Sequence, residues 1–158
     1  METVSPMASL QMTETVEPTK KEWENYRKAK FAKFQDYIPK RCFQSDDYVE
    51  GVALFGNYAF IATGNNIVQW DTKSGEKVRD YQGHTYGVSC VAVSPTGDWI
   101  VSGSRDMSLI QWDTKSGEKV RVYQGHTYGV SCVAVSPTGD WIVSGSGDMS
   151  LILLDTKS

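Results

Sequence analysis

His84, Ser102 and Asp106 are the three residue types of a hydrolytic triad. In such a site the imidazole takes the proton of the serine hydroxyl, and the carboxylate orients the imidazole. That chemistry requires the hydroxyl, the ring and the carboxylate to be hydrogen bonded in this order. A hydrolase is therefore the first function that these side chains suggest.

The same three residue types return one period later in the chain. Residues 71–112 are repeated almost letter for letter as residues 113–154, and only four of the 42 positions differ. An enzyme rarely needs its nucleophile in every repeat, whereas a network that holds each repeat together does. We therefore predict a structural role for both sets and no catalytic residue. The second set is His126, Ser144 and Asp148.

Short β-rich runs separated by turns are the elements that must position these side chains. Within one period the runs are 88–93, 99–102, 108–112 and 119–124, and Pro, Gly, Ser and Asp fill the turns between them. This pattern predicts a four-stranded antiparallel meander. Because one such sheet has two faces to bury, we expect several sheets to pack around an axis.

The motifs of the repeat occur in a fixed order. Each unit reads Gly-His, Ser-Pro-Thr-Gly-Asp, Ser-Gly-Ser-x-Asp and Trp-Asp, as at 83–84, 94–98, 102–106 and 112–113. Over residues 40–158 this resembles the WD-repeat β-propeller family. The resemblance implies an all-β fold, a partial β-propeller of about three four-stranded antiparallel blades. They are a divergent blade at 40–82, a complete blade at 83–124 and a blade lacking its outer strand at 125–158.

The resemblance also implies a structural hydrogen-bond network in each blade. In the complete blade its members are His84, Ser102, Asp106 and Trp112. In the last blade His126, Ser144 and Asp148 are present, but Leu154 replaces the Trp. In the divergent blade we expect Thr63 in the place of the strand serine, Ser45 and Asp46 near the expected Gly-His, and a following turn that is three residues shorter.

The region before the repeats has a different composition. Residues 1–18 are rich in Thr, Ser, Glu, Met and Pro and predict a disordered tail. Residues 19–38 predict one amphipathic α-helix that begins with a Thr19–Glu22 capping box and ends before Pro39. Its aromatic stripe would suit packing on the blades or on a second subunit. A membrane surface, a nucleic acid or a recruiting partner are the alternatives.

Function is expected on a face of the propeller. The resemblance implies a non-enzymatic scaffold or adaptor that binds proteins or peptides through the loops of one face. Arg105, which is Gly147 in the next repeat, breaks the period at such a loop, and Tyr86 and Tyr128 flank it. Arg and Tyr are frequent hot-spot residues, so these three are the predicted partner-binding residues. The alternative is neutral drift on an exposed turn.

Composition excludes several other classes. The formal net charge is −3, no stretch is long and apolar enough for a membrane span, and no secretory signal is visible. The three Cys have no metal-ligand spacing, and no metal site or cofactor is predicted. We expect a cytoplasmic or nuclear protein with protein partners and no nucleic acid.

Three blades are fewer than a closed propeller needs. The favoured explanation is that the chain derives from a longer repeat gene by truncation or duplication, and the second is that two copies combine as a homo-oligomer that completes the ring. The third alternative is an open, curved stack with exposed strand edges. The alternative function is therefore a truncated or self-assembling structural repeat module with no dedicated partner site.

Overall fold

The computed structural model describes residues 19–30 and 44–158. The chain forms two units, residues 1–44 and 45–158, and each is described by itself. The predicted tail at 1–18 and the part of the predicted helix at 31–38 lie outside the described residues.

Helix α1 (Lys20–Lys30) begins where the capping box places it. The backbone N–H of Thr19 donates to Glu22 Oε2 at 2.6 Å, and the N–H of Glu22 donates to Thr19 Oγ1 at 3.3 Å. These reciprocal bonds satisfy two amide groups that have no partner within the helix. Over residues 19–30 and 44–158, no helix is long and apolar enough to cross a membrane.

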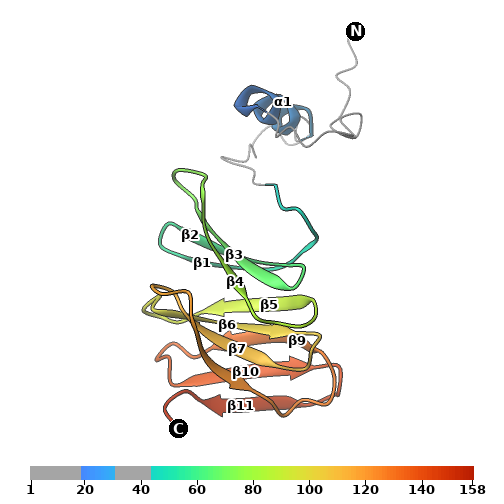
Figure 1. Cartoon of the computed structure of the whole chain (residues 1–158), viewed down its shortest axis with the longest axis vertical. Coiled ribbons are helices and arrows are strands. Elements are labelled where there is room, and N and C mark those ends of the chain that lie inside the picture. The colour runs from blue at the N-terminus through green and yellow to red at the C-terminus, as the bar shows by residue number, and fades with distance from the viewer. Residues whose placement is uncertain (1–18, 31–43) are drawn as a thin grey trace. The chain divides into compact units, whose positions relative to one another are not determined.

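Three antiparallel sheets make up residues 45–158, and we call them the first, second and third blades (Figure 1). The first blade contains β1 (Val49–Phe55), β2 (Tyr58–Thr63), β3 (Asn66–Asp71) and β4 (Lys77–Gln82). The second contains β5 (Val88–Val93), β6 (Trp99–Ser104), β7 (Leu109–Asp113) and β8 (Lys119–Tyr123). The third contains β9 (Val130–Val135), β10 (Trp141–Ser146) and β11 (Leu151–Asp155). The predicted all-β fold of partial propeller blades is confirmed.

Local turn chemistry sets the ends of these strands. Gly97 lies between β5 and β6 with a φ of 74°, in the left-handed region that glycine adopts without steric cost. After β7, the carboxylate of Asp113 accepts the N–H of Lys115 at 2.9 Å and of Ser116 at 2.7 Å. The Asp of the Trp-Asp motif therefore closes the turn that leads into β8.

Apolar side chains fill the two spaces between adjacent blades. The cluster between the first and second blades includes Phe60, Tyr81, Ile100 and Trp112, all buried. Val101, Leu109, Val130 and Ile142 are the most buried members of the cluster between the second and third. Each sheet thus buries a face against its neighbour, which explains why these short strands are stable only as a stack.

The first strand of each blade is interrupted at one residue. Pairing with the second strand shifts register at Glu50 in β1, at Ser89 in β5 and at Ser131 in β9. Such bulges redirect the side chain of the extra residue. Because these three positions are equivalent, they bring one side chain from each blade to the same end of the stack.

The register of the first blade corrects one prediction. Ile61 pairs with Val52 and Val68 as Ser102 pairs with Val91 and Ile110, so Ile61 occupies the position of Ser102. Thr63 instead corresponds to Ser104, and the turn after it is one residue shorter than in the second blade. The predicted equivalence of Thr63 with Ser102, and with it a turn three residues shorter, is therefore wrong.

Candidate functional site

The second blade contains a continuous chain of side-chain hydrogen bonds. Trp112 Nε1 donates to Ser102 Oγ at 2.9 Å, and Ser102 Oγ lies 2.8 Å from His84 Nε2. His84 Nδ1 lies 2.8 Å from Asp106 Oδ2. One proton arrangement satisfies every member: the serine hydroxyl donates to Nε2 and Nδ1–H donates to the carboxylate.

Further bonds hold the carboxylate of Asp106 at the turn between β6 and β7. Its Oδ2 accepts the N–H of Thr85 at 3.0 Å, and its Oδ1 accepts the Ser108 hydroxyl at 2.6 Å and N–H at 2.9 Å. Asp106 therefore connects the turn before β5 to the turn before β7. The network joins the loops of the blade as well as its strands.

The third blade repeats this network without its indole. His126 Nε2 lies 2.9 Å from Ser144 Oγ, and His126 Nδ1 lies 2.9 Å from Asp148 Oδ2. Leu154 pairs with Ile142 as Trp112 pairs with Ile100, so the leucine occupies the position of the tryptophan. Leucine has no donor, and Ser144 receives no indole N–H.

Burial decides between catalysis and structure for these groups. The order of Ser102, His84 and Asp106 matches a hydrolytic triad, but Ser102 is 0% exposed and the His84 side chain is 0% exposed. A substrate carbonyl cannot reach a hydroxyl enclosed between two sheets. The hydroxyl oxygen also accepts the Trp112 N–H. The geometry therefore supports packing and loop fixation, not acyl transfer.

The pKa shifts follow from this enclosure. Burial lowers the pKa of His84 below its usual 6.5, although the hydrogen bond to Asp106 opposes the change. For Asp106, burial alone would raise the pKa, but the hydrogen bonds from Ser108, His84 and Thr85 outweigh it and lower the pKa below 3.8. The pair is held as a neutral imidazole beside a carboxylate.

The first blade replaces the network with a simpler contact. Ser45 Oγ lies 2.8 Å from Thr63 Oγ1, and Asp47 Oδ1 accepts the N–H of Tyr48 at 2.7 Å. Ile61, at the serine position, is apolar and needs no partner. This blade is held by side-chain bonds near its loops and by the apolar cluster that it shares with the second blade.

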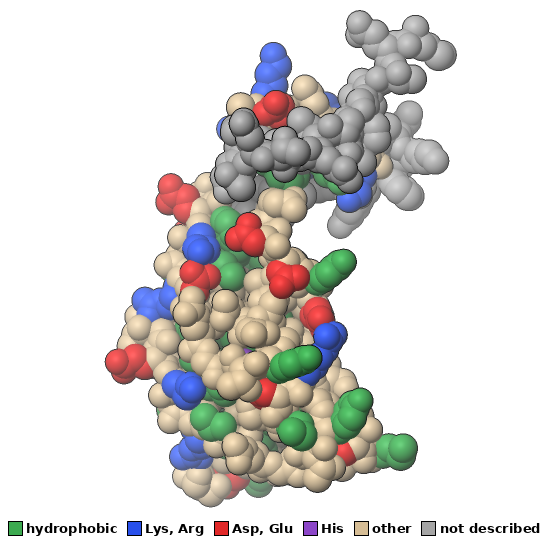
Figure 2. Space-filling view, turned by 45° about the vertical axis from the view of Figure 1, so that its right-hand side comes forward, with side chains coloured by type: hydrophobic (Ala, Val, Ile, Leu, Met, Phe, Trp, Pro, Cys, Tyr) green, Lys and Arg blue, Asp and Glu red, His purple; other side chains and the backbone are tan. Residues whose placement is uncertain are grey.

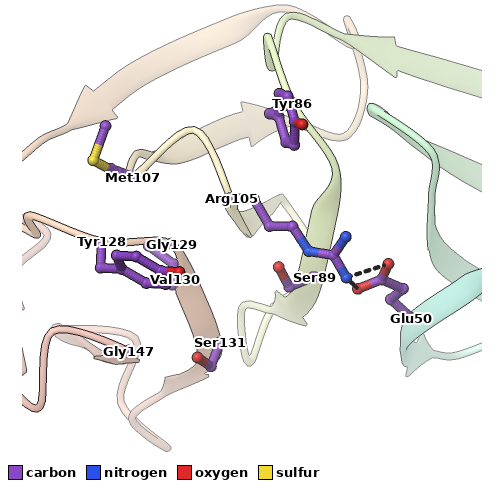
Figure 3. Close-up of a pocket in the computed structure, with 10 residues that line it drawn as sticks. All are labelled: Glu50, Tyr86, Ser89, Arg105, Met107, Tyr128, Gly129, Val130, Ser131 and Gly147. Carbon is purple, nitrogen blue, oxygen red and sulfur yellow. Dashed lines mark hydrogen bonds and ion pairs between the residues drawn. The ribbon is translucent and has the colours of Figure 1, made fainter.

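An open pocket lies at the end of the blades where the bulges and the loops meet (Figure 3). Its volume is about 730 Å³, within the range of ligand pockets. Its lining takes in the three predicted partner-binding residues and the three bulge positions. The lining residues are Glu50, Tyr86, Ser89, Arg105, Met107, Tyr128, Gly129, Val130, Ser131 and Gly147.

Arg105 forms an ion pair across this pocket. Its Nη2 lies 2.8 Å from both Oε1 and Oε2 of Glu50, which belongs to the first blade (Figure 3). The Arg105 side chain is 56% exposed and that of Glu50 is 32% exposed, so the pair is open to solvent. Tyr86 and Tyr128, both exposed, lie on two sides of the arginine.

The replacement of Arg105 by Gly147 in the next repeat also changes the pocket wall. A Cβ atom at Gly147 would lie 2.6 Å from Cδ1 of Tyr128, closer than real contacts allow. The ring of Tyr128 therefore occupies space that any side chain at position 147 would claim. This period break therefore supplies a cation on one side of the pocket and room for an aromatic ring on the other.

Glu50 is the pocket residue that sequence reasoning missed. It lies in the divergent blade, where no letter-by-letter match to Ser89 and Ser131 exists. The available signal was its charge, because Glu50 is an acidic residue in a blade next to the one that carries the unmatched Arg105. Strand register was needed to place the two together.

Among the described residues, no group of three His, Cys, Asp or Glu side chains is arranged to hold a metal ion. Cys90 is buried, and burial raises the pKa of its thiol to about 12. Such a thiol is protonated at neutral pH and is a weak nucleophile. The chemistry that the pocket offers is hydrogen bonding, ion pairing and aromatic contact.

Comparison with known proteins identifies the repeat. The family model "WD domain, G-beta repeat" matches residues 75–113 and 117–155. The first match ends at the Trp-Asp motif of β7. The second ends at the equivalent position of β11, where Leu154 stands in place of the Trp.

Relatives of known name match over shorter stretches. The serine-threonine kinase receptor-associated proteins of Bos taurus and Homo sapiens are each 30% identical over 74 residues, which is 45% of this chain and 21% of theirs. An uncharacterized WD repeat-containing protein of Schizosaccharomyces pombe is 40% identical over 43 residues, 27% of this chain and 11% of its own. The chain thus spans about a fifth or less of these relatives' length. The repeat matches, the blades and these relatives together show that the chain belongs to the WD-repeat family.

Proposed function

We propose that this chain is a non-enzymatic interaction scaffold that binds a protein or peptide partner in the pocket around Arg105. The observation that carries the proposal is the convergence of Tyr86, Arg105 and Tyr128 on one pocket. Each residue is exposed, and each belongs to a type that dominates binding energy at interfaces. WD repeats generally serve as interaction modules.

The composition of the pocket supports a partner rather than a reaction. The Ser, His and Asp side chains that could perform hydrolysis are bonded to each other and enclosed. The groups that remain accessible are two phenols, a guanidinium, the carboxylate that is ion paired with it, a thioether and two serine hydroxyls. The relatives from Bos taurus and Homo sapiens are named for association with a receptor, which supports a protein as the class of partner and not any one identity.

Quantitative affinity capture tests this proposal. The tagged full chain, a Tyr86→Ala/Arg105→Ala variant and a Lys115→Ala control are compared by mass spectrometry of bound proteins. Lys115 lies beyond β7 at the end of the blade opposite Arg105, so its loss removes a charge far from the pocket. We expect at least one partner that the wild type and the control retain and the double variant loses. Identical partner sets for all three proteins would refute the pocket as the binding site.

We propose self-assembly as the second candidate function, because apolar residues that are buried in the second blade are exposed at the equivalent positions of the third blade. Leu109 of the second blade is 2% exposed, and its repeat equivalent Leu151 in the third blade is 71% exposed. Figure 2 shows single hydrophobic side chains that protrude from one side of the molecule, with polar side chains and backbone between them. On the first blade, Val52 and Leu54 are 66% and 71% exposed.

A second copy of the chain is the occupant that we propose for these faces. The second blade packs on the third through one face, and the third blade carries the same residue types on its own exposed face. They are Cys132, Ala134, Val143, Gly145 and Leu151, and only Leu153, in place of Gln111, differs. The first blade of another copy would meet it as the third meets the second. Analytical ultracentrifugation tests the idea. A dimer that Leu151→Lys converts to monomer is expected, and a monomer at all concentrations would contradict it.

We further propose a cytoplasmic or nuclear location, on the basis of the buried free thiol of Cys90 and the absence of disulfides among the described residues. Imaging of a fluorescent fusion tests this, and an extracellular signal would contradict it.

A further inference from the structure

The unused hydrogen-bonding groups of the pocket indicate what its partner presents. Arg105 uses only Nη2 in side-chain bonds, and within residues 44–158 its Nε and Nη1 donate to no partner. The hydroxyls of Tyr86, Tyr128, Ser89 and Ser131 likewise make no hydrogen bond within that part of the chain. The pocket therefore offers several donors around one guanidinium.

Negatively charged groups are scarce in the same place. The carboxylate of Glu50 is the only acidic group in the lining, and both of its oxygens already accept from Arg105. A cationic ligand would meet the guanidinium, and the one carboxylate is already ion paired with it. An anionic ligand would find free N–H groups at Nε and Nη1. Each offers a single charge-assisted N–H···O contact, because Nη2, the second member of both parallel donor pairs of the guanidinium, already donates to Glu50.

From these contacts we infer that the pocket binds a peptide through an anionic side chain, which accepts a free N–H of Arg105 while Tyr86 and Tyr128 contact the flanking residues. This inference rests on the proposed function, since it names the partner chemistry of the same pocket. The anionic group is a carboxylate or a phosphate, because both present oxygen acceptors that match the guanidinium.

Glu50 acts as an internal competitor in this arrangement. Its carboxylate neutralises Arg105 in the free protein and repels an incoming anion at short range. Replacing Glu50 by Gln removes that charge and keeps the size of the side chain. If the ion pair only stabilised the fold, Glu50→Gln would weaken binding of the ligand. If Glu50 competes with the ligand for Arg105, the same substitution makes binding of the ligand tighter.

Four fluorescent peptide libraries test the inference by anisotropy with the purified full chain. Each is a degenerate nonapeptide whose central residue is fixed as Glu, phosphoserine, Lys or Ala. We expect the Glu or the phosphoserine library to bind about tenfold more tightly than the Lys and Ala libraries, which corresponds to one good charge-assisted contact. Whichever of the two binds more tightly identifies the source of the anion.

Variants assign that preference to the two residues. Arg105→Gln is expected to abolish the preference for the anionic library. Glu50→Gln is expected to tighten binding of the preferred library about threefold. Lys115→Gln, which changes the net charge as Arg105→Gln does, is expected to leave the preference unchanged. A preference that survives Arg105→Gln, a preference for Lys, weaker binding by Glu50→Gln, or no binding of any library would overturn the inference. Equal binding of all four libraries that still depends on Tyr86 and Arg105 would overturn the anion preference and leave the proposed function standing.

Discussion

Arg105 and Glu50 join the second blade to the first through a single nitrogen, Nη2, that lies 2.8 Å from both carboxylate oxygens. The contact combines a residue that breaks the repeat with one from the blade that diverges from it. Both lie at the same pocket as Tyr86 and Tyr128. One of the four period breaks and one residue of the divergent blade therefore meet at this pocket.

Loss of this ion pair is expected to affect binding far more than folding. The pair is exposed, so water and salt screen it, and Arg105→Gln should lower the free energy of unfolding by only about 0.5 kcal/mol. Urea unfolding followed by tryptophan fluorescence measures this. A loss of several kcal/mol would show that the pair is a structural tie between blades.

Two identical leucines should respond differently to the same substitution. Leu109→Ala removes a buried side chain between the second and third blades and is expected to cost about 3 kcal/mol of unfolding free energy. Leu151→Ala, at the equivalent exposed position, should cost less than about 0.5 kcal/mol. Both values come from urea titrations below the concentration at which self-association occurs. Equal costs would mean that the third blade's outer face is covered.

Exchange of the indole and the leucine tests the hydrogen-bond network. Trp112→Leu removes a donor to Ser102 and a fully buried ring, with an expected loss of about 3 kcal/mol in unfolding free energy. Leu154→Trp places an indole beside Ser144 and should add about 1 kcal/mol. Thermal unfolding of the two single variants and the wild type gives the comparison. A destabilising Leu154→Trp would show that the third blade has no room for the ring.

Acid should destabilise the blades in two steps. The pKa of His84 is lower in the folded protein than its usual 6.5, so the unfolded chain binds the extra proton and stability falls as the pH drops below 6.5. The pKa of Asp106 is also lowered, so a second loss begins below its usual 3.8.

Urea midpoints at pH 7.5, 6.5, 5.5 and 4.5 measure the first step. His84→Gln should lower stability at every pH, since it breaks the network, and should also flatten the dependence between pH 7.5 and 5.5. A midpoint that rises on acidification would contradict the assignment of a neutral His84.

The sequence predicted those features that the repeat makes visible. Because His84, Ser102 and Asp106 return as His126, Ser144 and Asp148, their structural role could be inferred before any distance was known, and both sets are hydrogen bonded in the fold. The strand from Val88 to Val93 was predicted with its observed bounds. Where two near-identical copies of the repeat agree, the alternation of β-rich runs and turns is enough to predict the strands.

The divergent blade shows where such reasoning stops. Ile61 and Thr63 lie two residues apart on the same face of β2, and only strand pairing shows which of them corresponds to Ser102. Glu50 was missed for the same reason, since its equivalence to Ser89 depends on a bulge that the sequence does not mark. Contacts between blades join residues that are far apart in the sequence, so they cannot be predicted from the residues of a single repeat.

Photo-crosslinking from a single position in the pocket tests the central claim most directly. A benzoylphenylalanine at position 128, in place of Tyr128, is compared with one at position 120, in place of Val120, which is exposed on β8 away from the pocket lining. If the pocket around Arg105 is the partner-binding site, a discrete adduct with a partner protein forms from position 128 and not from position 120, and Arg105→Ala in the same chain removes it. Adducts of equal yield from both positions, or an adduct that persists without Arg105, would contradict the account.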